Sequence, residues 1–232
     1  MRAALEYNNR GCMLFSLDCP GAFARAASRE EAVNKLPAEV AAFCRWSGGQ
    51  TPMGPVCIQE EKYQPELSVE DADGDMIFDQ ERRIVTETEY LTSRTLILRS
   101  ARDLDQLYAS IPDPDRPLAP PRKTFYGECP NTARKMFEHT NGVTGYYVGE
   151  LGAQAPIFSS CYETRLAGLA AVENLPDFLN LPVREGSYGE EWSLKKVLRR
   201  FLWHDRIHAR AMYRRARGIW GGKIADPFRL EG

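Results

Sequence analysis

The chain contains no run of about 18 apolar residues, the length that a helix needs to cross a membrane. Its first ten residues also lack the apolar stretch and the small-residue cleavage site of a signal peptide. We therefore expect no association with a membrane and a cytoplasmic location. With 232 residues, the chain is long enough for one large domain or two small ones.

Cysteine pairs of the Cys-x-x-Cys type are also absent. The six cysteines are scattered along the chain, at Cys12, Cys19, Cys44, Cys57, Cys129 and Cys161. The lack of such pairs excludes a thiolate zinc knuckle and a thioredoxin-type redox motif. We expect the cysteines to be reduced and mostly buried, because a free thiol behaves as a small apolar side chain.

Residues 1–62 predict a small unit that contains both strands and a helix. Two short apolar runs, 3–7 and 12–17, flank a turn sequence and predict a two-stranded ribbon. Ser28 stands three positions before a glutamate, which is the spacing of a capping box, and it predicts a helix over 29–46. Residues 56–62 then predict a further strand.

The rest of the chain predicts an acidic linker over residues 63–80 and an all-α region over 81–232. Apolar residues recur at helical intervals in four segments, at about 88–111, from near 131, over 161–175 and over 193–219. Four helices of this kind predict a four-helix bundle. The expected fold class is therefore α+β, with a small N-terminal α/β unit followed by the bundle.

Histidine is scarce, and the placement of the three histidines predicts a metal site. His204 and His208 lie one turn apart in the fourth predicted helix, so their rings share one face. These two and His139, in the second predicted helix, fall on apolar stripes that should turn toward neighbouring helices. Three neutral imidazoles leave a coordination position open, as in catalytic zinc sites. We therefore predict that all three bind one divalent metal ion.

The neighbours of these histidines offer no certain catalytic residue. Asp205 and Glu138 are adjacent to a ligand in sequence, so they point about 100° away around the helix, and we expect both to meet solvent. Tyr146 and Tyr147 could present a hydroxyl to the site, but aromatic residues there are more typical of a core. The sequence lacks His-Glu-x-x-His, which excludes a zincin-type protease.

The fourth predicted helix is strongly basic, with nine lysines and arginines between Lys195 and Arg217. Such a helix can contact phosphates, or its charges can simply keep one face in solvent. We expect the second, because the apolar stripe of this helix is already committed to packing. Nucleic-acid binding is therefore not expected.

Part of the N-terminal unit resembles the HicB-like fold of antitoxin-type proteins. The resemblance is carried by Leu17-Asp18-Cys19-Pro20-Gly21-Ala22-Phe23-Ala24, followed by Ser28-Arg29-Glu30-Glu31-Ala32 at the start of a helix. It covers about a quarter of the chain. HicB antitoxins usually carry a separate DNA-binding segment, and the sequence shows no helix-turn-helix.

Residues 81–220 resemble the DinB-like superfamily of four-helix bundles, which carry one histidine in the second helix and a His-x-x-x-His pair in the fourth. The matching residues are Trp192-Ser193-Leu194 and Val197-Leu198 before His204, and Tyr146-Tyr147 and Leu151-Gly152 after His139. The resemblance implies that His139, His204 and His208 bind zinc or nickel. It also implies a bacterial protein, often dimeric, that transfers or uses a low-molecular-weight thiol.

Together these observations predict a divalent-metal-dependent enzyme, a thiol-dependent transferase or a hydrolase, that acts on a small molecule. The alternative is a non-catalytic metal-binding module of regulatory or interaction type with a HicB-like part. Gly142, Gly145 and Gly149 follow His139 and each cost about 1 kcal/mol of helix propensity. We therefore expect them to interrupt the second helix and to place His139 near a bend.

Overall fold

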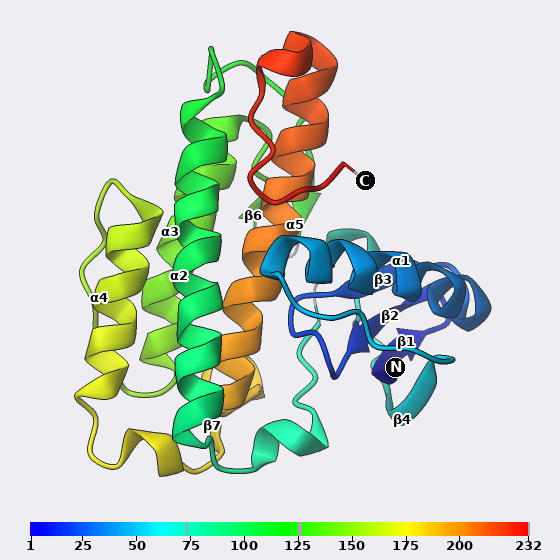
Figure 1. Ribbon diagram of the computed structural model, residues 1–232, viewed down its shortest axis with the longest axis vertical. Helices are drawn as coiled ribbons and strands as arrows, with labels where there is room; N and C mark the ends of the chain where they lie inside the picture. The colour runs from blue at the N-terminus through cyan, green and yellow to red at the C-terminus, as the bar shows by residue number, and fades with distance from the viewer. Residues whose placement is uncertain (73, 125–126, 232) are drawn as a thin grey trace.

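The computed structural model describes residues 1–72, 74–124 and 127–231, and these residues form a mixed α/β fold (Figure 1). Half of the chain is helical and 15% is in strands. One four-stranded sheet and five α-helices account for most of this structure in the described ranges. The sheet and one helix lie beside the other four helices, which run along the long axis of the molecule (Figure 1).

The sheet contains β1 (Arg2–Asn8), β2 (Gly11–Ser16), β3 (Phe23–Ala26) and β4 (Cys57–Tyr63), in the order β3-β2-β1-β4. β1 pairs with β2 in the antiparallel sense and with β4 in the parallel sense. Both strands of the predicted ribbon and the later strand are confirmed. β3 is an addition, because its four residues are too short to give a period in the sequence.

Helix α1 (Arg29–Ser47) makes the crossover between β3 and β4 and packs on β2 and β3. The side chain of Ser28 accepts a hydrogen bond from the backbone N–H of Glu31, so the predicted cap is confirmed. Gly48 ends the helix with φ of 80°, a left-handed conformation that glycine adopts without a steric penalty.

The four remaining helices are α2 (Glu87–Ala109), α3 (Ala133–Gly149), α4 (Cys161–Glu173) and α5 (Leu194–Trp220). A threonine or serine caps the first turn of each one. α5 packs against both α2 and α3, and α4 packs against the same two helices. The glycines of α3 do not interrupt it: the helix is continuous from His139 to Gly149. This expectation was wrong because packing outweighs the helix propensity of single glycines.

The helical part also contains two short pairs of antiparallel strands. β5 (Lys123–Thr124) pairs with β6 (Gly127–Glu128), and β7 (Arg184–Glu185) pairs with β8 (Glu191–Trp192). The first hairpin stands before α3, and the second stands before α5. Each hairpin therefore leads the chain into a helix that carries a histidine of the predicted metal site.

Residues 63–80, which the sequence predicts as a linker, pack against the sheet and α5. Leu67 and Phe78 are buried with Phe15 of β2 and Trp203 of α5. Two short 3₁₀ helices, Val69–Asp71 and Asp79–Arg82, lie in or directly after this segment. The predicted linker includes Asp73, which lies outside the described residues.

A continuous apolar cluster joins the sheet and α1 to the helical part. It includes Leu14 of β2, Trp46 of α1 and Phe201 of α5. The indole N–H of Trp46 also donates a hydrogen bond of 2.6 Å to the carboxylate of Asp103 on α2. These contacts hold the sheet against the helices. None of the helices within the described ranges is long and apolar enough to span a bilayer.

Candidate metal centre

Two helices bring the three histidines together at one point. His204 and His208 project from successive turns of α5, and His139 projects from the middle of α3. The Nε2 atoms of His139 and His204 are 3.2 Å apart. The centroid of the His208 ring lies 4.4 Å from that of His204 and 4.8 Å from that of His139. One nitrogen from each ring falls within 4.8 Å of the other two.

The three rings differ in their exposure. His204 is buried and His208 is partly buried, as the apolar stripe of α5 predicts. His139 is exposed, so the expectation that it lies on a buried stripe was wrong. Its Nε2 atom is nevertheless turned toward His204.

The surroundings of all three imidazoles favour their neutral form. Burial of its imidazole among the neighbouring groups lowers the pKa of His139. Burial, helped by the neighbouring His208 and His139, holds the pKa of His204 well below its usual value. Burial and the neighbouring His139 lower the pKa of His208 to about 3. Neutral imidazole is the form that binds a metal ion.

The arrangement fits a divalent transition-metal ion. Zinc binds imidazole nitrogen at about 2.0–2.1 Å, so two ligands of a tetrahedral site stand about 3.3 Å apart. The 3.2 Å between His139 and His204 matches this spacing. A purely nitrogen donor set suits zinc or nickel, whereas calcium and magnesium prefer oxygen. The buried Nδ1 atom of His204 has no hydrogen-bond partner in the part of the chain that the structure describes.

The histidines face a cavity of about 370 Å³. Tyr147, with 4% of its surface exposed, turns its ring edge-on to His204, and Tyr146 is more exposed. Both tyrosines line the cavity. Tyr147 also belongs to the hydrophobic core, as the sequence favoured, whereas Tyr146 does not. The sequence analysis missed Arg200, which also lines the cavity. It stands four residues before His204, a spacing that places both on one face of α5 and could have revealed it.

Segments distant in sequence form the remaining wall of the cavity. Cys129 and Arg122 line it, and the Arg122 guanidinium donates to the Cys129 thiol over 3.4 Å and forms an ion pair with Asp71. Tyr188, 80% exposed, also borders the cavity and has a φ of 62°, which is uncommon for a residue other than glycine. No local pattern in the sequence predicts these contacts.

The residues adjacent to the histidines behave differently from one another. Glu138 is exposed, as expected. Asp205 is fully buried instead of meeting solvent, because the turn that carries it away from the imidazole directs it toward α4. There it accepts two hydrogen bonds, of 3.0 and 3.2 Å, from the guanidinium of Arg165. Neither acid is a hydrogen-bond partner of a histidine among the contacts described.

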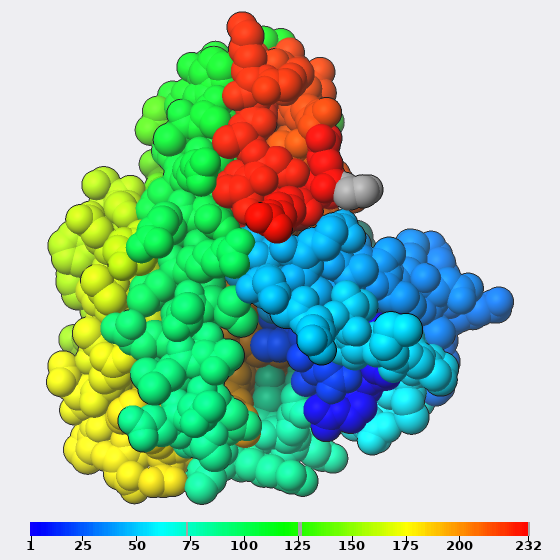
Figure 2. All heavy atoms as spheres, viewed as in Figure 1, coloured from blue at the N-terminus to red at the C-terminus, as the bar shows by residue number. Residues whose placement is uncertain are grey.

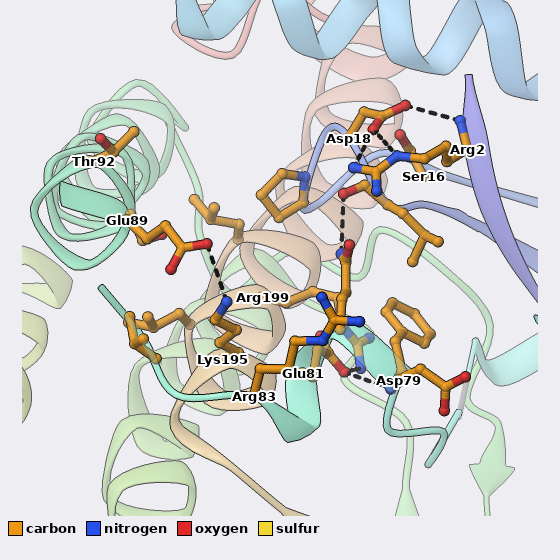
Figure 3. A pocket seen from close by; sticks show the side chains of 18 of the residues that line it. Arg2, Ser16, Asp18, Asp79, Glu81, Arg83, Glu89, Thr92, Lys195 and Arg199 are labelled. Carbon is orange, nitrogen blue, oxygen red and sulfur yellow. Dashed lines mark hydrogen bonds and ion pairs between the residues drawn. The ribbon is translucent and has the colours of Figure 1, made fainter. Parts of the chain in front are cut away.

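A larger cavity, of about 750 Å³, lies between the sheet, α2 and the first half of α5 (Figure 3). A hollow between α2 and the N-terminal unit is visible on the surface in Figure 2. Its charged groups are largely paired with each other: Arg2 with Asp18, Lys195 with Glu89, and Arg199 with Glu81. Its described lining contains no histidine or cysteine.

Comparisons with family models, with curated proteins and with solved structures find no match to this chain.

Proposed function

We propose that His139, His204 and His208 bind one divalent ion, zinc or nickel, and that the protein is a metal-dependent enzyme acting on a small molecule. The observation that carries this proposal is the convergence of three neutral imidazoles on a cavity of about 370 Å³. Cavities of this size take small ligands. When bound, the ion would lower the pKa of a water molecule or hold a thiol as its thiolate.

The chain's own groups would orient the substrate beside the ion. Arg200 extends along the cavity wall, where its guanidinium donates to Glu190 over 2.6 Å and to the carbonyl of Gly74. These contacts fix the position of its charge. The Tyr146 and Tyr147 rings supply apolar surface, and burial holds the pKa of Tyr147 at about 12, so its hydroxyl stays protonated at neutral pH. The wall thus combines a cation with a hydrogen-bond donor.

The fold supports a more specific assignment, which remains part of the proposal. Helices α2 to α5, with one histidine on α3 and two on α5, resemble the DinB-like four-helix bundle expected over residues 81–232. The sheet and α1 correspond to the HicB-like unit expected over residues 1–62, with 63–80 joining the two. In that assignment the reaction is a thiol-dependent transfer or a hydrolysis, and the protein forms a homodimer.

Metal analysis of the full chain, purified without an affinity tag, tests the site. We expect about one equivalent of zinc or nickel, after titration if necessary, and a large loss of affinity in His139→Ala, His204→Ala and His208→Ala. Glu138→Gln is the matched control, because its side chain is adjacent to a ligand but exposed. Binding of less than about 0.2 equivalents, without uptake on titration, contradicts the proposal.

Catalysis needs a separate measurement. The metal-loaded protein is offered glutathione, bacillithiol or mycothiol together with electrophilic small molecules, and hydrolysis is followed without a thiol. We expect turnover that disappears in His204→Ala and persists in Glu138→Gln. Metal binding without turnover in any of these assays favours the alternative, a non-catalytic regulatory or interaction module.

A further inference from the structure

A basic groove of about 730 Å³ lies between β3, α1 and the second half of α5. α1 lies directly beside α5 in Figure 1. Six cationic side chains line the groove: Arg25, Lys35, Arg206, Arg210, Arg214 and Arg215. The described lining contains a single carboxylate, that of Glu39. The groove therefore carries a strong excess of positive charge in a chain whose net charge is −2.

The positive charges of the groove are only partly balanced. Glu39 forms an ion pair with Arg210, and Lys35 forms one with Glu31. Arg25 donates to backbone carbonyls, of which the nearest, at 2.7 Å, belongs to Glu70. Carbonyl groups bring no net charge, so the cation of Arg25 adds to the potential of the groove.

Two further arginines of the groove extend into solvent. Arg214 and Arg215 are exposed on α5, and neither forms an ion pair among the described residues. Exposed guanidinium groups are mobile enough to close on a ligand, and their planar forks match phosphate oxygens.

Arg206 is the second, independent feature of the groove. Its side chain is 3% exposed, and its two terminal nitrogens have no hydrogen-bond acceptor within the described ranges. Its guanidinium lies over the rings of Phe43 and Trp46, at 5.3 and 5.4 Å from their centroids. These rings attract the cation through their π faces but carry no negative charge. The carboxylate of Glu39 attracts this charge, but Glu39 is already paired with Arg210. A buried charge that is only partly balanced is unfavourable, and the low dielectric around it strengthens its attraction for an anion in the groove.

We propose that this groove binds a phosphorylated small molecule, at a site separate from the three histidines. The exposed cations of Arg214 and Arg215 would meet the phosphoryl groups, and the buried charge of Arg206 beneath them would add to the positive potential of the groove. Phe23 and Ile207, which also line the groove, would contact the organic part. The volume is that of a small-ligand cavity, whereas a nucleic acid requires an extended surface. The proposal does not depend on a metal ion or on catalysis.

Calorimetry with inorganic pyrophosphate tests the groove in the full chain, before and after treatment with a chelator. We expect one pyrophosphate site whose affinity is unchanged by the chelator and by His204→Ala. This result would distinguish the groove from pyrophosphate bound to a metal ion at the three histidines. The double variant Arg214→Gln/Arg215→Gln should bind roughly tenfold more weakly. Arg83→Gln removes an equally exposed cation outside the groove and should bind as the parent protein does. Absence of binding at millimolar pyrophosphate, or an equal loss in Arg83→Gln, overturns the proposal.

Arg206→Met provides a second test, because it keeps an unbranched side chain in the same space without the charge. We expect its Tm to rise in the absence of pyrophosphate and its pyrophosphate-dependent increase in Tm to become several-fold smaller than that of the parent protein. An undiminished increase contradicts the role of this charge. If Arg206→Met fails to fold, the affinity of Arg214→Gln/Arg215→Gln for pyrophosphate provides the test of the groove. Tighter binding of duplex DNA or RNA than of pyrophosphate, with a steep dependence on salt, overturns the assignment to a small molecule.

Discussion

The guanidinium of Arg165 on α4 and the carboxylate of Asp205 on α5 form an ion pair in which both side chains are fully buried. Asp205 directly follows His204 in α5. The ion pair therefore fixes the position of the helix that carries two of the three histidines. Arg165 also donates to the hydroxyl of Thr144 on α3 and lies over the ring of Phe201. α3 and α5, which carry the three histidines, therefore meet α4 at one charged contact.

Asp205→Ala should lower the free energy of unfolding by about 3–5 kcal/mol, because it leaves the guanidinium of Arg165 buried without a counter-ion. Urea denaturation measures the loss. The double variant Arg165→Met/Asp205→Leu should recover much of it, since apolar side chains carry no cost of burying charge. Asp115→Ala, which removes an exposed partner of Arg134, is the control and should have little effect. A double variant no more stable than Asp205→Ala would contradict this account.

Glu6 on β1 makes stability depend on pH in the neutral range. Its side chain is fully buried, and one of its oxygens accepts a hydrogen bond of 3.2 Å from the backbone N–H of Asp75. Burial, together with the hydrogen bond to the Asp75 side chain and its negative charge, raises the pKa of Glu6 from 4.5 to about 8. The folded protein therefore holds a proton on Glu6 that the unfolded chain releases. The stability that this proton provides is complete below pH 4.5 and decreases as the pH rises toward 8.

Glu6→Gln should raise the free energy of unfolding at pH 7, on the order of 2–3 kcal/mol, and flatten its dependence on pH between about 4.5 and 8. The amide keeps the shape of the side chain and has no proton to lose. Urea midpoints at several pH values, with the exposed Glu66→Gln as control, provide the measurement. An unchanged pH profile in Glu6→Gln would exclude this residue as the source.

Local signals in the sequence predicted the five α-helices and three of the four strands of the main sheet. Helix caps such as Ser28 can be recognised in the sequence, because the capping side chain and the backbone N–H that it binds lie three residues apart. His204 and His208 are readable for the same reason, since a single helical turn relates them. His139 needed the further assumption that α3 packs against α5. The structure places it beside the other two, although on an exposed edge.

Contacts between distant segments were not predictable in this way. Arg165 and Asp205 are 40 residues apart, and nothing in either helix alone shows that they meet. The acidic composition of residues 63–80 concealed the apolar side chains of Leu67 and Phe78, which are buried against Trp203. In the sequence, Arg206 is one of many charged residues on a basic helix. Its burial depends on the position of α1, whose Phe43 covers its guanidinium.

The cysteines should differ strongly in reactivity. The thiols of Cys19 and Cys44 are both buried and 3.7 Å apart, and burial together with Cys44 raises the pKa of Cys19 to about 12. Cys57 is exposed on β4. Because the thiolate is the reactive form, we expect a fast reaction of Cys57 with Ellman's reagent and a much slower one of Cys19.

Cys57→Ser should remove the fast phase of this reaction and leave the slow phases intact, and the slow thiols should become accessible in denaturant. Cys19→Ser provides the matched control, because it should leave the fast phase unchanged. A rapid loss of two thiols together in the native protein, without release in denaturant, would instead show that Cys19 and Cys44 are readily oxidised to a disulfide.

Two glycines should respond in opposite ways to the same substitution. A Cβ atom at Gly168 of α4 would lie 2.6 Å from the γ-methyl group of Thr144 on α3, whereas one at Gly145 of α3 would meet nothing within 4 Å. Thr144 cannot easily rotate away, because it is fully buried and its hydroxyl accepts a hydrogen bond from Arg165. Gly168→Ala should therefore force α3 and α4 apart and cost about 1–3 kcal/mol.

Gly145→Ala should raise the free energy of unfolding by about 0.5–1 kcal/mol, because alanine loses less backbone entropy in a helix and the site has room for its methyl group. Urea denaturation of both variants measures the difference. A stabilising Gly168→Ala would mean that α3 and α4 are farther apart than described.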